Sequence, residues 1–223
     1  MHLLEELSQR RMLAIVRADG PDQALRCIRT LVDAGVTALE VSLTTPGALD
    51  AITRARSQLP PSVLLGAGTV LTADQADAAS TAGAGFVVTP GVTHGARRAA
   101  ATGTPLLCGA LTPTEVITAL DLGASAVKVF PAGLHGPGYV RELRAPLPEA
   151  PLVAVGGVDA ATASAYLAAG AVAVGIGSPL LGSAGSSGTQ QAQDELAARA
   201  ATFLAAVGAR RTAADHRRGQ EGR

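Results

Sequence analysis

Eight short apolar runs alternate with alanine-rich segments along nearly the whole 223-residue chain, and this alternation restricts the possible fold more than any other feature. The runs are continuously apolar rather than alternating, which is typical of parallel strands that are buried on both faces. They lie at Met12–Val16, Ala38–Leu43, Leu64–Thr69, Phe86–Thr89, Pro105–Cys108, Ala126–Phe130, Leu152–Val155 and Val172–Ile176.

Between these runs, the spacing of apolar residues predicts helices. They are expected at Asp22–Ala34, Ala48–Leu59, Ala73–Ala82, His94–Ala101, Thr114–Leu122 and Ala160–Ala169, with a weaker one after Gly138 and a longer one at Gln190–Val207. Gly83, Gly103 and Gly123 recur every 20 residues, each past a predicted helix, where a left-handed residue stops the helix. Eight strands, each followed by a helix, predict an α/β fold: a (β/α)8 TIM barrel forming a single domain over residues 1–207.

The rival fold is an open doubly wound sheet, which carries a dinucleotide-type glycine loop after its first strand. Here the first run is followed by Arg17-Ala-Asp-Gly-Pro, which does not match that loop, so the barrel is favoured. Ser183–Gln190 is expected to be a flexible connection before the last helix. Residues 208–223 are charged and lack apolar periodicity, so we expect them to form a disordered C-terminal tail.

Charge and composition argue against several classes of protein. The 18 basic and 18 acidic residues balance, so we expect no nucleic-acid partner. The apolar runs are too short to span a bilayer, and the polar start Met1–Arg11 is not a secretory signal, so we expect no membrane partner. Cys27 and Cys108 make neither a disulfide framework nor a metal cluster, and no His, Asp and Glu spacing fits a divalent metal. We therefore expect a cytoplasmic, enzyme-like domain with no metal and no cofactor.

Lys128 is the only lysine among the 18 basic residues, and the other 17 are arginines. Arginine can replace lysine as a surface charge but not as an amine nucleophile. Lys128 lies between Val127 and Val129 in an apolar run, and we expect these neighbours and Phe130 to surround a neutral, nucleophilic amine. The pattern indicates a Schiff-base lysine. A lysine that extends to solvent or pairs with Glu40 is the structural alternative.

Glu40 is a carboxylate within the second predicted strand, where burial costs energy unless the group has a partner. We expect it to act as a general acid and base that moves protons between oxygen and carbon atoms of a substrate. A structural ion pair with Arg17 or Lys128 is the alternative.

Further polar residues stand at strand ends, on the carboxyl face where barrel active sites form. Arg17 suits a carboxylate or phosphate through its planar guanidinium group, and Thr69 ends a Gly-Ala-Gly turn with a hydroxyl group. Gly156-Gly157 and Gly177-Ser178 follow the last two strands, where backbone N–H groups commonly cradle phosphate in this fold. Plain turns are the alternative for both glycine segments.

Five motifs follow one another, in order and with suitable spacing, between Leu13 and Gly182. They read Leu39-Glu40-Val-Ser-Leu-Thr-Thr-Pro, Gly66-Ala-Gly-Thr69-Val-Leu, Val88-Thr-Pro90-Gly, Val127-Lys128-Val-Phe-Pro131 and Val155-Gly-Gly157-Val. Together they resemble the 2-keto-3-deoxy-6-phosphogluconate / 4-hydroxy-2-oxoglutarate aldolases.

The resemblance implies a class I, metal-free aldolase on a (β/α)8 barrel, usually a homotrimer. Such an enzyme cleaves a 2-keto-3-deoxy-6-phospho sugar acid to pyruvate and glyceraldehyde 3-phosphate, as in the Entner–Doudoroff pathway. The family's Schiff-base lysine falls on Lys128 and its proton-transferring glutamate on Glu40. The implied substrate and phosphate contacts fall at strand ends, on Thr69, Pro90, Gly157, Gly177 and Ser178.

Two positions depart from the gluconate-type members of that family. Thr44 stands where those members commonly carry an arginine, and Val155 where they commonly carry a threonine. Three features resemble the galactonate-specific branch of the family: Val155, the end of the first strand at Arg17, and the Gly136-Pro-Gly-Tyr139 loop. Without a cation at position 44, we expect Arg17 to hold the substrate carboxylate or to help with phosphate. Candidate substrates are both C4 epimers and 4-hydroxy-2-oxoglutarate, which would yield pyruvate and glyoxylate.

Two other functions fit part of the pattern. An isomerase or synthase acting on another sugar phosphate would share the barrel and the phosphate turns but would need no imine-forming lysine. A non-catalytic sugar-phosphate-binding protein would bind its ligand without turnover, and the presence of both Lys128 and Glu40 argues against it.

Overall fold

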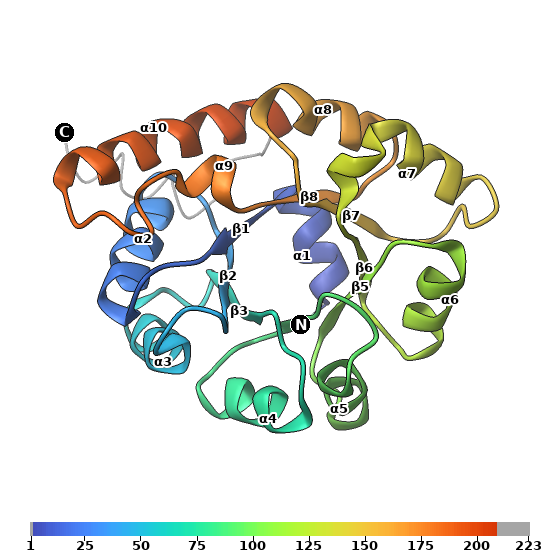
Figure 1. The fold of residues 1–223 in the computed structure, drawn as a ribbon, viewed down its shortest axis with the longest axis horizontal. Helices are drawn as coiled ribbons and strands as arrows, with labels where there is room; N and C mark the ends of the chain where they lie inside the picture. Colours follow the sequence, from blue (N-terminus) through green and yellow to red (C-terminus); the bar gives the residue numbers. More distant parts are fainter. Residues whose placement is uncertain (1, 209–223) are drawn as a thin grey trace.

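Eight parallel strands close into a barrel in which each strand bonds to the next and β8 returns to β1 (Figure 1). The strands are β1 (Met12–Val16), β2 (Ala38–Ser42), β3 (Leu64–Gly68), β4 (Val87–Val88), β5 (Leu106–Ala110), β6 (Ala126–Val129), β7 (Leu152–Val155) and β8 (Ala173–Ile176). The computed structural model, which describes residues 2–208, confirms the (β/α)8 fold. The tail expected from position 208 onward lies outside the described residues except for Gly208.

Helices other than the first follow the strands and form an outer ring around the barrel, and the first helix precedes β1 (Figure 1). They are α1 (Leu3–Arg10), α2 (Pro21–Asp33), α3 (Ala48–Gln58), α4 (Ala73–Thr81), α5 (His94–Thr102), α6 (Pro113–Asp121), the 3-10 turn η1 (Ala132–Leu134), α7 (Gly136–Arg144), α8 (Ala160–Ala168), α9 (Ser178–Leu181) and α10 (Gln190–Val207). Gly83, Gly103 and Gly123 have φ angles of 93°, 70° and 93°, which confirms the predicted left-handed residues after α4, α5 and α6. No helix among residues 2–208 is long and apolar enough to cross a membrane.

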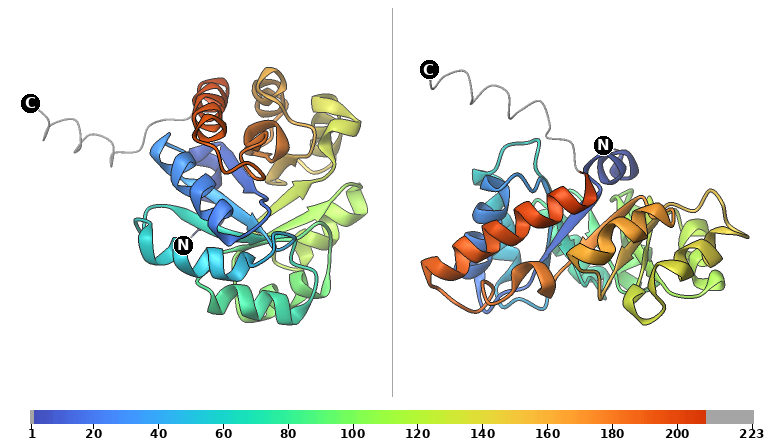
Figure 2. Two further views of the ribbon diagram at one scale, coloured as in Figure 1. Left: turned by 60° about the vertical axis from the view of Figure 1, so that its left-hand side comes forward. Right: turned by 90° about the horizontal axis from the view of Figure 1, so that it is seen from above.

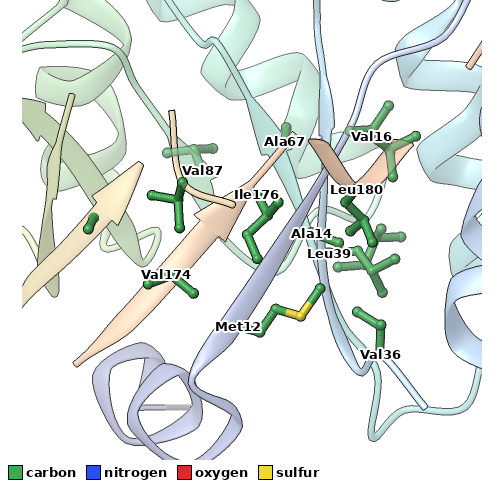
Figure 3. Close-up of a cluster of buried hydrophobic side chains, with 14 of the residues drawn as sticks. Met12, Ala14, Val16, Val36, Leu39, Ala67, Val87, Val174, Ile176 and Leu180 are labelled. Carbon is green, nitrogen blue, oxygen red and sulfur yellow. The ribbon is translucent and has the colours of Figure 1, made fainter. Parts of the chain in front are cut away.

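Strand side chains alternate between two hydrophobic layers. The outer layer packs between strands and helices, and Figure 3 shows part of it around Met12, Leu39 and Val174. The inner layer fills the barrel and includes Leu13 and Phe86. Burial on both faces explains why the strand sequences are continuously apolar. The same alternation points the side chains of Glu40 in β2 and Lys128 in β6 into the barrel.

Helix α1 covers the amino-terminal end of the barrel, and the apolar pattern did not predict it. Leu3 and Leu7, one turn apart, are 1% and 0% exposed and belong to the same buried cluster as Leu13 and Ala38 near the starts of β1 and β2. Figure 1 shows α1 through the ring of strands, and Figure 2 shows it against one end of the barrel. The opposite end, where the strands finish, is the one open to a ligand.

The segment Ser183–Gln190 is packed against the loop after β1, which corrects the prediction of a flexible connection. Gln23 of α2, 7% exposed, donates hydrogen bonds to two backbone carbonyls of this segment. The backbone N–H of Asp19 donates to the carbonyl of Gly185 at 3.0 Å, and a side chain at Gly185 would collide with the carbonyl of Arg17. The small residues of this segment therefore permit close packing.

Candidate active site

A cavity of about 440 Å³ opens at the carboxyl ends of the strands, and all eight residues that the sequence predicted for the site line it. They are Arg17, Glu40, Thr69, Pro90, Lys128, Gly157, Gly177 and Ser178. These residues lie in or just after nearly every strand, so they are distant in sequence. Closure of the barrel is what brings them to one place.

Lys128 lies on the inward face of β6 and is 7% exposed. Its Nζ atom is 5.0 Å from the centre of the Phe130 ring, within the range of a cation–π contact. Val127 and Val129 belong to the outer layer against the helices, so the expectation that they surround the amine was wrong. Strand alternation points them away from Lys128. The apolar part of the cavity wall comes from residues such as Phe130 and Val155.

Glu40 lies on the inward face of β2 and is 1% exposed. Gly68 in the neighbouring strand β3 provides its space, because a Cβ atom there would lie 2.7 Å from Glu40 Oε1. Glu40 Oε2 has no hydrogen-bond partner within the described residues. In that part of the chain Glu40 also forms no ion pair with Arg17 or Lys128, so the structural alternative is not realised.

The burial of Glu40 governs its protonation. Burial raises the pKa of the Glu40 carboxyl above its ordinary value, and the positive charges of Lys128 and Arg17 oppose part of this rise. A rise in its pKa makes an ionised carboxyl group a stronger base. This property suits the general acid–base role expected from the sequence.

Ser42 and Thr44, two hydroxyl residues at the end of β2, connect residues of the cavity, and the sequence reasoning did not assign them to the site. Arg17 Nε donates to Thr44 Oγ1 at 3.2 Å. Ser42 Oγ lies 2.8 Å from Thr44 Oγ1 and 2.9 Å from Thr69 Oγ1. A signal was present for Ser42, because two residues after Glu40 the strand again points inward. Only the fold shows that Thr69 is its neighbour.

Two glycine segments border the cavity after β7 and β8. Gly156 and Gly157 have φ angles of 89° and 74°, which favour glycine. The backbone N–H of Gly133 donates to the carbonyl of Gly156 at 2.7 Å, and a Cβ atom on Gly157 would lie 2.9 Å from the Gly133 Cα. Gly177 and the exposed Ser178 lie at the end of β8 and also line the cavity. Backbone and one hydroxyl group thus form this part of its edge, as a phosphate group would require.

Val155 closes part of the wall at the end of β7 and is 2% exposed. Gly175 in β8 accommodates it, since a Cβ atom there would lie 2.7 Å from Val155 Cγ2. The valine side chain contributes only methyl groups to the cavity wall, directly before the Gly156-Gly157 segment. It can therefore shape the space available to a ligand without offering it a hydrogen bond.

The fold and the cavity define an enzyme of the (β/α)8 class in which a lysine and a buried carboxyl group face one ligand space. The family model described as KDPG and KHG aldolase matches residues 3–194 of this chain. A 2-dehydro-3-deoxy-6-phosphogalactonate aldolase of Escherichia coli (strain K12) is 37% identical over 171 residues, which are 76% of this chain and 83% of that protein. The chain belongs to the KDPG and KHG aldolase family. It is an aldolase, a carbon–carbon lyase.

Solved structures agree with this assignment. A structure of native KDPGal has a TM-score of 0.79 at 35% identity, covering 87% of this chain and 93% of that chain. A chain of a cube-shaped, highly porous protein cage, designed by fusing symmetric oligomeric domains, has a TM-score of 0.81 at 33% identity, covering 95% of this chain and 77% of that chain.

Proposed function

We propose that this aldolase is a class I enzyme that cleaves a 2-keto-3-deoxy-6-phospho sugar acid to pyruvate and glyceraldehyde 3-phosphate through a Schiff base on Lys128. One observation carries the proposal: the only lysine of the chain faces inward, into the same cavity as Glu40. A surface charge would not need to be a lysine in so arginine-rich a chain, whereas an imine requires a primary amine.

The reaction begins when the neutral Nζ of Lys128 attacks the C2 ketone carbon, and the carbinolamine loses water to give an iminium ion. Glu40, directly or through a water molecule, takes the proton of the C4 hydroxyl. The C3–C4 bond then breaks, its electron pair moves into the iminium, and an aldehyde and an enamine form. Glu40 returns the proton to C3 of the enamine. Water hydrolyses the resulting iminium and frees pyruvate and Lys128.

We assign one set of hydrogen-bond donors to the carboxylate of the substrate and another set to its phosphate. Arg17 and Thr69 hold the C1 carboxylate, Arg17 through guanidinium nitrogens other than the Nε that it gives to Thr44. Pro90 contributes an apolar contact at the end of β4. The phosphate group is bound at the edge formed by the backbone and hydroxyl donors of Gly157, Gly177 and Ser178.

We infer that the galactonate epimer is cleaved at least as well as the gluconate epimer. The epimers differ in the orientation of the C4 hydroxyl, and Val155 offers methyl groups where a threonine would offer a hydrogen bond. The 2-dehydro-3-deoxy-6-phosphogalactonate aldolase of Escherichia coli, 37% identical, supports this choice. Because 4-hydroxy-2-oxoglutarate carries the same keto acid end, its cleavage to pyruvate and glyoxylate follows from the same lysine chemistry.

We also infer that residues 1–207 form the catalytic barrel domain and that the protein is a cytoplasmic homotrimer. The similarity to a chain of a cage made from symmetric oligomeric domains supports self-association. Cys27 and Cys108 are buried free thiols, which agrees with a reducing compartment.

A coupled assay tests the proposed activity. Purified protein is given each C4 epimer separately, and pyruvate release is followed with lactate dehydrogenase and NADH in buffer containing excess EDTA. We expect pyruvate from at least one epimer, because the imine of Lys128 supplies the electron sink. Conversion of a substrate without pyruvate release would favour an isomerase or synthase, and binding without any turnover would favour the non-catalytic alternative.

A further inference from the structure

A continuous chain of hydrogen-bonding groups connects Arg17 and Thr69, two residues that line the cavity. It passes from Arg17 Nε to Thr44 Oγ1 over 3.2 Å, from Thr44 Oγ1 to Ser42 Oγ over 2.8 Å, and from Ser42 Oγ to Thr69 Oγ1 over 2.9 Å. Ser42, in the middle of the chain, is 0% exposed, while Arg17 and Thr44 are exposed. A charged group at the surface is thereby connected to a hydroxyl group inside the cavity.

The direction of the chain follows from its first member. A guanidinium nitrogen can only donate, so Thr44 Oγ1 accepts from Arg17 and directs its own proton elsewhere. The positive charge favours the order in which every hydroxyl proton points away from it, so that Thr44 donates to Ser42 and Ser42 donates to Thr69. In this order the Thr69 proton is the one left without an acceptor among the described residues. Because Thr69 lines the cavity, that proton is offered to a ligand.

The backbone at Thr69 gives a second, independent observation. Its φ angle is 61°, a left-handed conformation that β-branched residues rarely adopt. Such an outlier on a cavity wall is typical of a side chain whose position is set by function rather than by backbone preference.

We propose that Ser42 and Thr44 are positioning residues that transmit the charge of Arg17 and fix Thr69 as a hydrogen-bond donor to a carboxylate oxygen of the bound keto acid. This inference rests on the proposed function, since the keto acid is the ligand that Lys128 captures. An anionic ligand at Thr69 and a cation at Arg17 favour the same proton order, so binding strengthens the chain from both ends. The expected effect is on affinity for the carboxylate rather than on the nucleophile.

The test measures how Lys128 is captured by two small ketones, using borohydride reduction of the imine. Pyruvate carries the carboxylate, and hydroxyacetone lacks it. The variants are Ser42→Ala, Thr44→Val, which removes the hydroxyl with little change of shape, and Thr44→Ser, which restores it. Thr30→Val is the control, because it removes a 2.9 Å hydroxyl contact to Gln193 between α2 and α10, away from the cavity.

For Ser42→Ala and Thr44→Val, we expect the pyruvate concentration that gives half-maximal trapping to rise roughly 3- to 10-fold, with the maximal extent of trapping unchanged. With hydroxyacetone the same variants should shift less than about twofold, and Thr44→Ser and Thr30→Val should stay near the parent with both ketones. If Ser42→Ala fails to fold, the variants at Thr44 still provide the test, because the Thr44 side chain is exposed and its replacement should not prevent folding.

Equal shifts with both ketones, or no shift with pyruvate, would overturn the proposed hydroxyl chain while leaving the lysine chemistry intact. A parent protein that neither ketone modifies would instead overturn the proposed function, and this inference with it.

Discussion

At the residue scale, Glu40 is buried, and no group among residues 2–208 forms a hydrogen bond to its Oε2 atom. Its native pKa is raised, so the folded protein holds the proton more tightly than the unfolded chain. The stabilising effect of this proton is complete below the ordinary carboxyl pKa and is lost as the pH rises through the higher native pKa. At neutral pH the wild-type protein therefore carries a cost that a neutral side chain avoids.

Replacement of Glu40 by glutamine should accordingly stabilise the protein at about pH 8 by on the order of 1 kcal/mol, or roughly 2–4 °C in Tm, and abolish most activity. The gain in stability should shrink as the pH falls below the ordinary carboxyl pKa of 4.5, because the wild-type carboxyl then becomes protonated in both states. Thermal unfolding of both proteins across this pH range shows whether the difference in Tm grows or shrinks as the pH falls. A gain that is larger in acid than at neutral pH would contradict the burial effect.

Val155 allows a prediction about epimer choice. Replacing a hydrogen-bonding contact by an apolar one changes preference by roughly 2- to 13-fold. We expect the wild-type protein to cleave the galactonate epimer at least as well as the gluconate epimer, and Val155→Thr to raise the relative kcat/KM on gluconate by a factor in this range. Measuring kcat/KM for both epimers with both proteins provides the comparison. Strong gluconate preference in the wild type, or an unchanged ratio in the variant, would show that Val155 does not contact C4.

At the element scale, β3 is adapted to its neighbour β2. A methyl group at Gly68 would lie 2.7 Å from the Oε1 atom and 2.8 Å from the Cδ atom of Glu40, so Gly68→Ala should displace the carboxyl group. A displacement of about 1 Å commonly costs roughly 100-fold in rate, and we expect a loss of that order in kcat. Gly20→Ala is the matched control, since the backbone at Gly20 is extended at φ −178° and no heavy atom in the described part of the chain lies within 4 Å of the added methyl group. Equal activities of the two variants would contradict the packing of β3 against Glu40.

The sequence predicted the strands well because burial on both faces produces one simple pattern. Helix α1 was not predicted from the sequence, because its eight residues contain only two leucines that are buried, and their burial depends on the end of the barrel that they cover. Among site residues, Lys128 and Glu40 were recognisable as polar groups in apolar strands. The link from Ser42 to Thr69 crosses between β2 and β3, and no local pattern records a contact between strands. The packing of Gly185 was misread as flexibility for the same reason.

At the scale of the whole molecule, we expect three chains to associate. Light scattering coupled to size exclusion should give a particle of three times the 22.2 kDa chain mass over a wide range of protein concentration. Apolar side chains such as Leu134 would then be covered. A mass equal to a single chain at micromolar concentration would contradict the homotrimer without affecting the chemistry proposed for the cavity.

The most direct test of the central claim is covalent capture of pyruvate by Lys128. The protein is incubated with pyruvate and sodium borohydride, and the site of modification is found by peptide mass spectrometry, with Lys128→Arg as the parallel sample. We predict one reduced pyruvate adduct per chain, located on Lys128, and a Lys128→Arg protein that folds but is neither modified nor active, because a guanidinium group is not a usable nucleophile at neutral pH. An unmodified wild-type protein, or a Lys128→Arg variant that retains activity within about tenfold of the wild type, would contradict the Schiff-base mechanism.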